Sequence, residues 1–210
     1  MRAAVVDAAK GKAVVRRYAE MPIPPGAVVA GEILDEDAVA ETVAALWKRA
    51  KLPKKRVVAG SASQKLVVRQ VDVPQMGESE LKEALPFQVQ DSIPIAVEDA
   101  MLDFIPLEEF STPEGEPMQS ILAIAVHREV VQSLVKVTEA AKLSLLALDL
   151  QAFGLVRAVF GLEHDVEDPY QAIVDIGGSV TQLIIAKGGT ARFVRMLPTG
   201  GEQFTNALVE

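Results

Sequence analysis

The stretch Asp175-Ile-Gly-Gly-Ser-Val-Thr181, with Gly200-Gly201 further on, decides the fold of this chain. The residues before it, Gln171-Ala-Ile-Val174, predict a buried strand, which puts Asp175 at a strand end that leads into a glycine turn. Glycines let a backbone come close to a ligand, because they lack a Cβ and tolerate positive φ, and turn N–H groups can point at a phosphate. An aspartate at the same place could hold a hydrated Mg²⁺, which prefers oxygen ligands. The pattern is also typical of a plain hairpin whose aspartate caps the turn.

The segments on both sides of this turn come in a characteristic order. Residues 182–186 and 191–197 predict two further strands joined by a Lys187-Gly188-Gly189 turn, and residues 202–209 predict a helix. Upstream, residues 151–157 predict a helix that leads toward the motif strand. Strand, glycine turn, antiparallel strands, double glycine and helix together resemble the second phosphate segment of the actin-like ATPase superfamily.

This resemblance implies ATP and Mg²⁺ as ligands. It makes Asp175 both a catalytic residue and the magnesium-binding one, and Gln151 a second catalytic residue, because actin has a glutamine at the matching place that orients the attacking water. A polar residue at the start of a helix is the alternative interpretation of Gln151. The residues that the resemblance places around the nucleotide and its metal are Asp175, Gly177, Gly178, Ser179, Thr181, Gly200 and Gly201.

The composition favours an α/β protein and excludes several kinds of site. Hydrophobic residues make up 50% of the 210 residues and aromatic ones only 5%, which indicates a core of Val, Ala, Leu and Ile. A formal charge of −8 argues against nucleic-acid binding, because such binding depends on basic contacts to phosphates. Without cysteine, the chain has no disulfide and no thiolate chemistry. We expect a cytoplasmic protein without a membrane span or signal peptide, held at the inner face of the membrane through a partner.

The first third of the chain predicts a hairpin, a helix and two strands. Strands are expected at residues 3–6, 12–16, 56–60 and 65–73, and a helix over residues 37–50 with Asp35 as its cap. A basic cluster surrounds the end of this helix. It is typical of a solvated helix end, favoured by the helix dipole, and a contact with anionic lipid is the alternative. The cluster comprises Lys48, Arg49, Lys51, Lys54, Lys55 and Arg56.

The middle of the chain predicts a small α/β unit. Residues 78–92 favour an acidic amphipathic helix interrupted by Pro86, and residues 99–106 and 120–126 favour strands on either side of a polar loop at 108–117. Residues 127–142 predict a second helix, and residues 143–148 a further strand.

Taken together, the segments resemble the PilM family of type IV pilus assembly proteins, which is related to the cell-division protein FtsA. The resemblance implies an α/β, actin-like ATPase (ribonuclease H-like) fold with the 1C insertion of the FtsA and PilM branch. Subdomain 1A would comprise residues 1–72 and 146–170, the 1C insertion residues 73–145, and residues 171–210 the start of subdomain 2A. The segments that carry the resemblance are Pro22-Ile-Pro-Pro-Gly-Ala-Val28, Gly31-Glu-Ile-Leu34, Glu78-Ser-Glu-Leu-Lys-Glu-Ala84, Ser92-Ile-Pro-Ile95, Ala123-Ile-Ala-Val126, Glu129-Val-Val131, Leu148-Asp-Leu-Gln-Ala-Phe153, and Asp175-Ile-Gly-Gly178 with its hairpin and Gly200-Gly201.

Two departures from the family pattern limit the expected activity. The family's first strand and first phosphate loop would precede Met1, and its adenosine motif would follow Glu210, so the expected fold is incomplete. Phosphoryl transfer needs charge neutralisation from several sides. We therefore expect this chain by itself to bind ATP weakly or not at all, and to be inactive as an enzyme.

The resemblance also implies a partner. In this family a groove between 1A and 1C receives the cytoplasmic N-terminal peptide of the membrane protein PilN, which belongs to an inner-membrane complex with PilO. The expected wall of that groove is Leu81, Leu85, Phe87 and Val89, although these residues are equally suited to pack within 1C. Self-association is a further expectation. The alternatives for the whole chain are an FtsA-like cell-division ATPase, a GspL-like secretion adaptor and an enzyme of the sugar-kinase branch.

Overall fold

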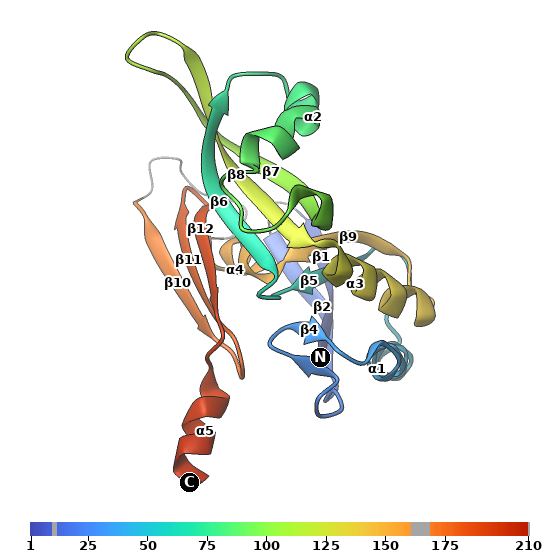
Figure 1. Ribbon diagram of the computed structural model, residues 1–210. Coiled ribbons are helices and arrows are strands. Elements are labelled where there is room, and N and C mark those ends of the chain that lie inside the picture. The colour runs from blue at the N-terminus through green and yellow to red at the C-terminus, as the bar shows by residue number, and fades with distance from the viewer. Residues whose placement is uncertain (10–11, 161–168, 210) are drawn as a thin grey trace.

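The computed structural model describes residues 1–9, 12–160 and 169–209 (Figure 1). It begins with the expected hairpin, in which β1 (Arg2–Ala9) and β2 (Lys12–Glu20) pair antiparallel with a bulge between Val5 and Val6. A small second hairpin, β3 (Val28–Val29) and β4 (Glu32–Ile33), follows the proline-rich passage. These short elements lead directly into the first helix.

Two helices cover a parallel strand pair in the lower half of the molecule. In α1 (Glu36–Ala50) the Asp35 side chain accepts the N–H of Ala38 at 2.9 Å, which confirms the predicted cap. Helix α1 lies beside α3 (Arg128–Ala140), and β5 (Val57–Ser61) pairs in parallel with β9 (Leu145–Leu150). Parallel strands need a long crossover, and here the whole middle of the chain supplies it.

The middle of the chain forms an antiparallel sheet of order β6-β8-β7, made of β6 (Leu66–Pro74), β8 (Pro117–His127) and β7 (Ala100–Ser111). Strand β8 is apolar from Ile121 to Val126, where both of its faces are covered. Ile121, Ala123 and Ala125 pack under α2 (Glu78–Val89) and the 3-10 turn η1 (Val97–Asp99), whereas Leu122, Ile124 and Val126 belong to a separate core.

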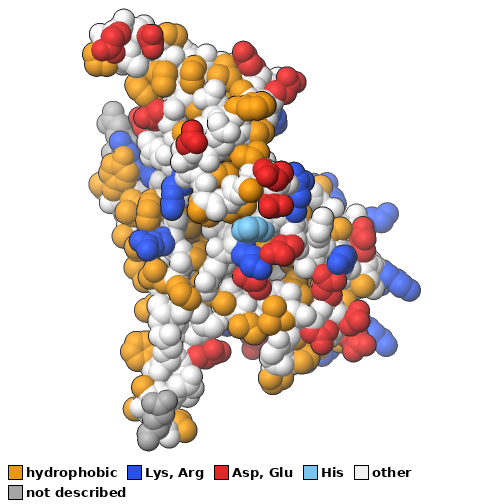
Figure 2. Space-filling model, viewed as in Figure 1, with side chains coloured by type: hydrophobic (Ala, Val, Ile, Leu, Met, Phe, Trp, Pro, Cys, Tyr) orange, Lys and Arg blue, Asp and Glu red, His pale blue; other side chains and the backbone are white. Residues whose placement is uncertain are grey.

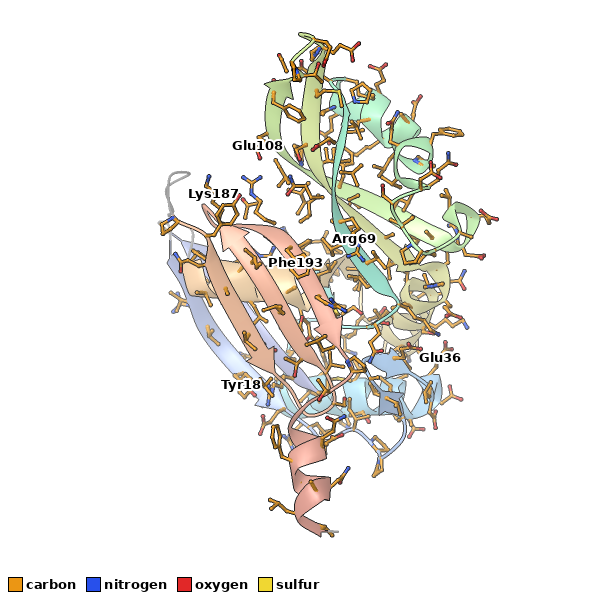
Figure 3. All side chains as sticks on the ribbon, turned by 60° about the vertical axis from the view of Figure 1, so that its left-hand side comes forward. Tyr18, Glu36, Arg69, Glu108, Lys187 and Phe193 are labelled. Carbon is orange, nitrogen blue, oxygen red and sulfur yellow. The ribbon has the colours of Figure 1, made fainter. Side chains whose placement is uncertain are left out.

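That separate core joins the middle sheet to the last part of the chain. Helix α4 (Gln151–Phe160) packs against the meander of β10 (Gln171–Ile176), β11 (Thr181–Lys187) and β12 (Thr190–Leu197), and β12 lies against β6. Arg192 of β12 pairs with Glu108 of β7, with Nη1 and Oε1 3.4 Å apart. This pair links the meander to the middle sheet, on which Figure 3 labels Glu108. Helix α5 (Gly201–Val209) projects from the far end of the meander and buries none of its residues (Figure 1).

Three sequence predictions differ from the structure. Strand β10 was expected to be buried, but Val174 and Ile176 are 57% and 63% exposed. The reason is that β10 is an edge strand, which pairs with β11 alone among the described residues, so β11 takes the central, buried place with Ile184 fully covered. Helix α2 is not interrupted at Pro86 but runs through it and ends at Val89.

The third difference concerns the polar loop expected at residues 108–117. Strands β7 and β8 extend into it, pairing Glu109 with Gln119 and Phe110 with Met118, and leave a short turn in which the N–H of Thr112 donates to Glu116 O at 3.0 Å. Backbone pairing continues there because an antiparallel hairpin tolerates polar side chains on its solvent faces. Within the described ranges, no helix is both long and apolar enough to cross a membrane.

Candidate functional site

The structure brings the two predicted glycine segments into direct contact. The Gly177 N–H donates to Val180 O at 3.0 Å and closes the turn, while the N–H groups of Gly201 and Glu202 donate to Gly177 O and Gly178 O, each at 2.9 Å. A Cβ added at Gly200 would lie 2.3 Å from Gly178 O and 2.5 Å from Gly177 O. Glycine is therefore required here so that two backbones can touch, and not for positive φ, which none of these glycines adopts.

This contact decides which backbone groups a ligand can reach. The first N–H groups of α5 would ordinarily be available to an anion at a helix N-terminus, but the carbonyls of the glycine turn already occupy two of them. Gly178 and Ser179 are exposed at the tip of the turn, so their backbone is accessible to a phosphate. Thr181 is buried and its hydroxyl donates to Thr199 O at 2.7 Å, so this side chain holds the glycine turn against the segment before α5.

Asp175 and Gln151, predicted from separate segments, meet through a residue that the sequence analysis did not select. Gln182 lies opposite Asp175 in the β10–β11 register, and its Nε2 donates to Asp175 Oδ2 at 3.2 Å and to Gln151 Oε1 at 3.4 Å. Gln182 is 3% exposed, and its Oε1 is buried without a hydrogen-bond partner among the described residues. Its signal in the sequence was a lone polar residue at the start of an otherwise apolar strand.

Gln151 lies at the carboxyl ends of the parallel strands. It directly follows β9, and a Cβ added at Gly60 of β5 would lie 3.3 Å from Gln151 Cγ. In α/β sheets, ligands bind outside the carboxyl ends of parallel strands. The position of Gln151 therefore fits a ligand-facing residue as well as an ordinary helix start.

A second acidic side chain that the sequence analysis missed lies beside the glycine turn. A Cβ added at Gly178 would be 3.1 Å from Glu202 Oε1, at the start of α5. Asp175 thus precedes the turn on β10, and Glu202 lies beside Gly178 at the start of α5. Carboxylates in such a position suit a hydrated divalent cation, which would also reduce their repulsion of a phosphate.

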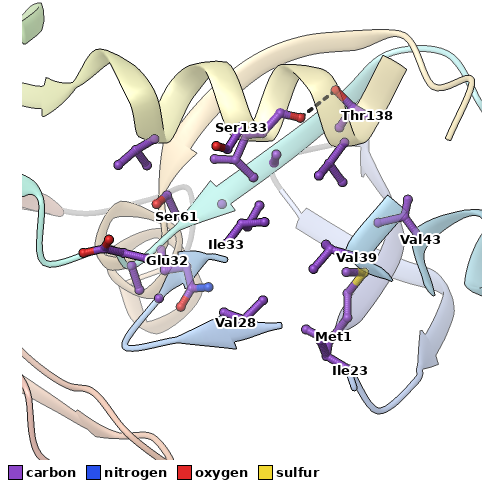
Figure 4. Close-up of a pocket in the computed structure, with 18 of the residues that line it drawn as sticks. Met1, Ile23, Val28, Glu32, Ile33, Val39, Val43, Ser61, Ser133 and Thr138 are labelled. Atoms are coloured by element: carbon purple, nitrogen blue, oxygen red, sulfur yellow. Dashed lines mark hydrogen bonds between the residues drawn. The ribbon is translucent and has the colours of Figure 1, made fainter. Parts of the chain in front are cut away.

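A cavity of about 740 Å³ borders this cluster (Figure 4). Its walls come from α1, α3, β4 and the whole of β5, with Gln151 at its margin. The lining is largely apolar, and Figure 4 shows Met1, Ile23, Val28, Ile33, Val39 and Val43 around it. Among the described residues β5 pairs with β9 alone and β1 with β2 alone, so the other edges of β1 and β5 are unpaired.

An ion cluster lies at the rim of the cavity. Lys65 Nζ is 2.7 Å from Glu129 Oε1 and 2.8 Å from Glu32 Oε2. The hydrogen bonds to Glu129 and Glu32 raise the pKa of Lys65 above its ordinary value, and the bond from Lys65 lowers the pKa of Glu129. Lys65 and Glu32 are half-buried and Glu129 is exposed, so solvent screens these ion pairs and they add little stability.

The predicted peptide-binding residues on α2 are not equivalent. Leu81, Leu85 and Val89 are buried against the β6-β8-β7 sheet, whereas Phe87 is 74% exposed. A pocket of about 590 Å³ adjoins the same helix. It is lined by Lys82, Leu85 and Pro86 of α2, residues 100–104 of β7, Val97, Glu98 and Arg128.

Comparison with known proteins identifies the family. The family described as "Type IV pilus assembly protein PilM" matches residues 1–210. A solved structure, "PilM-PilN type IV pilus biogenesis complex", is similar with a TM-score of 0.85 and 25% identity over 99% of this chain and 61% of that one. A second solved structure is the cytoplasmic domain of EpsL, an inner-membrane component of the type II secretion system of Vibrio cholerae. The match covers 82% of this chain and 59% of that one at 17% identity, and its TM-score of 0.48 supports no argument.

The similarity to the PilM structure confirms the predicted α/β, actin-like ATPase fold. The chain spans about three-fifths of the length of that structure's chain. With the family matched from Met1 to Glu210, this chain belongs to the PilM family of type IV pilus assembly proteins.

Proposed function

We propose that this chain is a component of type IV pilus assembly that binds the cytoplasmic N-terminal peptide of a PilN-type membrane protein. The observation that carries the proposal is the match over 99% of the chain to a structure described as a PilM–PilN complex. The match of the PilM family to all 210 residues disfavours the FtsA-like, GspL-like and sugar-kinase alternatives. In this proposal the PilN-type partner holds the protein at the inner face of the membrane. Through that partner the protein also joins the PilN–PilO complex.

The place we propose for the peptide is the pocket between α2 and β7, which lies within the 1C segment and not at its border with 1A, where the sequence analysis expected the groove. Strand β7 is an outer strand of its sheet and pairs only with β8 among the described residues, so it offers an edge to an extended peptide. Met101 of β7 is exposed and lines the pocket, and the exposed Phe87 directly follows the lining residue Pro86 on α2. Lys82 and Arg128 add positive charge at the rim, and Glu98 and Asp103 add negative charge. A backbone-paired peptide would thus find both an apolar contact and charge partners.

The proposed subdomains are 1A at residues 1–72 and 146–170, 1C at residues 73–145, and the start of 2A at residues 171–210. Residues 161–168 of the second 1A segment lie outside the described residues. The core that Leu81, Leu85 and Val89 of α2 form with Ile121, Ala123 and Ala125 of β8 supports a 1C unit. Helix α3 belongs to the 1C segment by sequence but packs on α1, so it would join 1C to 1A.

We also propose that the glycine turn forms one side of a Mg²⁺–ATP site in the complete family fold. The residues present fit such a site, because Asp175 is a half-buried carboxylate and the buried Oε1 of Gln182 has no partner among the described residues. When bound, Mg²⁺–ATP supplies the phosphoryl group and the metal that neutralises its charge. Asp175 would hold the hydrated metal, the backbone of Gly178 and Ser179 would lie against a phosphate, and Gln151, oriented by Gln182, would hold a water.

The test is a calorimetric titration of the 210-residue chain with a synthetic N-terminal PilN peptide. We expect binding that Phe87→Asp weakens at least tenfold, because a charge replaces an apolar contact surface. Phe204→Asp is the matched control, since Phe204 on α5 is 72% exposed and far from the pocket. Leu85 is not a suitable probe, because a charge at this buried position would unfold the 1C core. Absence of binding, or equal effects of the two Phe variants, would refute the proposed partner site.

A further inference from the structure

The side of the molecule where α1 and α3 both end carries a group of cations that no step above uses. Helix α1 ends at Ala50 and α3 at Ala140, and the two following loops meet where the Ser144 N–H donates to Lys54 O at 2.8 Å. Lys and Arg side chains protrude at the right-hand edge of Figure 2, the side on which α3 ends. We call this group the basic corner, and it comprises Lys48, Arg49, Lys51, Lys54, Lys55, Arg56 and Lys142.

Six of the seven cations of the basic corner come from a stretch of sequence without acidic residues. Residues 42–71 contain eight Lys and Arg and no Asp or Glu, in a chain whose formal charge is −8. The six cations from Lys48 to Arg56 are all exposed, and none of the ion pairs among the described residues includes a member of the basic corner. Other cations of the chain do form pairs, such as Lys65 with Glu129 and Lys136 with Glu36. The cations of the basic corner therefore have no ion-pair partner within the described part of the protein.

Helix stability explains only part of this cluster. Lys48, Arg49 and Lys142 lie at helix C-termini, where the dipole favours cations, but Lys54, Lys55 and Arg56 lie beyond α1. In addition, Lys51, Arg56 and Lys142 adopt φ values of 51°, 59° and 59°, in the left-handed region that glycine or asparagine occupies with less strain. Cations are present at these positions although smaller residues would suit the backbone better.

The loop that carries the cations is held in place. The Trp47 Nε1–H donates to Pro53 O at 2.9 Å, and the Leu52 N–H donates to Trp47 O at 3.1 Å. Arg17 donates to Lys51 O, and Arg49 donates to Glu20 O at 2.6 Å, so both arginines tie the loop to the β1–β2 hairpin. A fixed loop presents its charges together and loses little conformational entropy when it binds.

We propose that the basic corner binds the anionic headgroups of a membrane surface, as a second attachment beside the peptide contact. This inference rests on the proposed function, which brings the chain to a membrane through its partner. Each Lys or Arg near an anionic bilayer raises affinity about fivefold, so three of them would contribute on the order of 100-fold. The net charge of −8 opposes this attraction, so the contact is weak alone and effective when a partner holds the chain nearby. A nucleic acid fits less well, because no exposed aromatic side chain stands among the cations for base stacking.

The experiment is co-sedimentation of the 210-residue chain with vesicles of phosphatidylcholine, with and without phosphatidylglycerol, in the absence of any peptide. The variant Lys48→Gln, Lys54→Gln, Lys55→Gln removes three charges of the basic corner. The control Arg16→Gln, Lys136→Gln, Arg195→Gln removes three exposed charges that lie outside both the basic corner and the proposed peptide pocket, so both variants have the same net charge. We expect binding that requires phosphatidylglycerol and falls with added salt, that the corner variant weakens about 100-fold and that the control changes less than twofold.

Three results would overturn the inference. They are sedimentation that does not depend on phosphatidylglycerol, equal weakening by both variants, and an oligonucleotide that binds the corner as tightly as the vesicles at the same salt concentration. A corner variant that sediments like the original chain but melts at a lower temperature would show that these cations only stabilise the helix ends. Peptide titration of both variants separates this inference from the proposed function, because the peptide should bind each of them equally. Vesicle binding without peptide binding would refute the proposed PilN-type partner but would still support the lipid contact of the basic corner.

Discussion

Replacing Gly200 with alanine is expected to detach α5 from the glycine turn. The new Cβ would lie 2.3 Å from Gly178 O, and ordinary contact begins at 3.4 Å, so the two backbones must separate by about 1 Å. The hydrogen bonds from Gly201 and Glu202, now 2.9 Å long, would then exceed the range of a hydrogen bond. Two such bonds contribute about 2 kcal/mol together. Because α5 buries no residue, little else holds it in place.

The assay is amide hydrogen exchange. A loss of about 2 kcal/mol corresponds to roughly 30-fold faster exchange at Gly201 and Glu202, whereas Ile184 in the core should keep its protection. The matched control is Gly154→Ala, because Gly154 lies inside α4 and a Cβ there meets nothing within 4 Å. This control should stabilise the protein by up to about 1 kcal/mol, the usual helix preference for alanine.

Two outcomes would refute this reasoning. Unchanged exchange at Gly201 and Glu202 in the Gly200→Ala variant would show that the close approach of the two glycine segments does not determine their contact. Accelerated exchange at Ile184 as well would show that the glycine contact supports the whole β10–β12 meander, and not only its last helix.

Two further predictions concern pH and nucleotide. The Lys65 ion pair lowers the pKa of Glu129 in the folded state. The pair therefore stabilises the fold at pH values above the unfolded pKa of about 4.3, and this stabilisation is lost as the pH falls through the lower folded-state pKa. Lys65→Met should therefore flatten the decline of melting temperature below about pH 5, and parallel curves for the two proteins would count against the pair. For the nucleotide, NMR titration of this chain with Mg²⁺–ATP should give weak shifts confined to Gly178, Ser179 and the Gln182 side chain. Asp175→Asn should abolish them, and shifts that persist in that variant would remove Asp175 from the site.

Local signals predicted most of the secondary structure. Three of these predictions depend only on neighbours within a few residues, and the structure contains all three. They are the Asp35 cap, the β1–β2 hairpin and the succession of strands and turns from β10 to β12. The continuous apolar run at residues 121–126 likewise indicated a strand, and it is the strand whose two faces are both covered. An error came where a run of polar residues was taken for a loop, at residues 108–117, which form the end of a paired hairpin.

The sequence by itself determined the order of elements and the identity of the glycine segments, because a glycine pair and an aspartate at a strand end are local patterns. Only the tertiary structure decided what these residues touch. It placed Gln182 between Asp175 and Gln151, since strand register and helix packing depend on contacts far apart in the chain. It also turned Leu81, Leu85 and Val89 inward and Phe87 outward, because a helix shows which of its faces is covered only once a sheet lies against it.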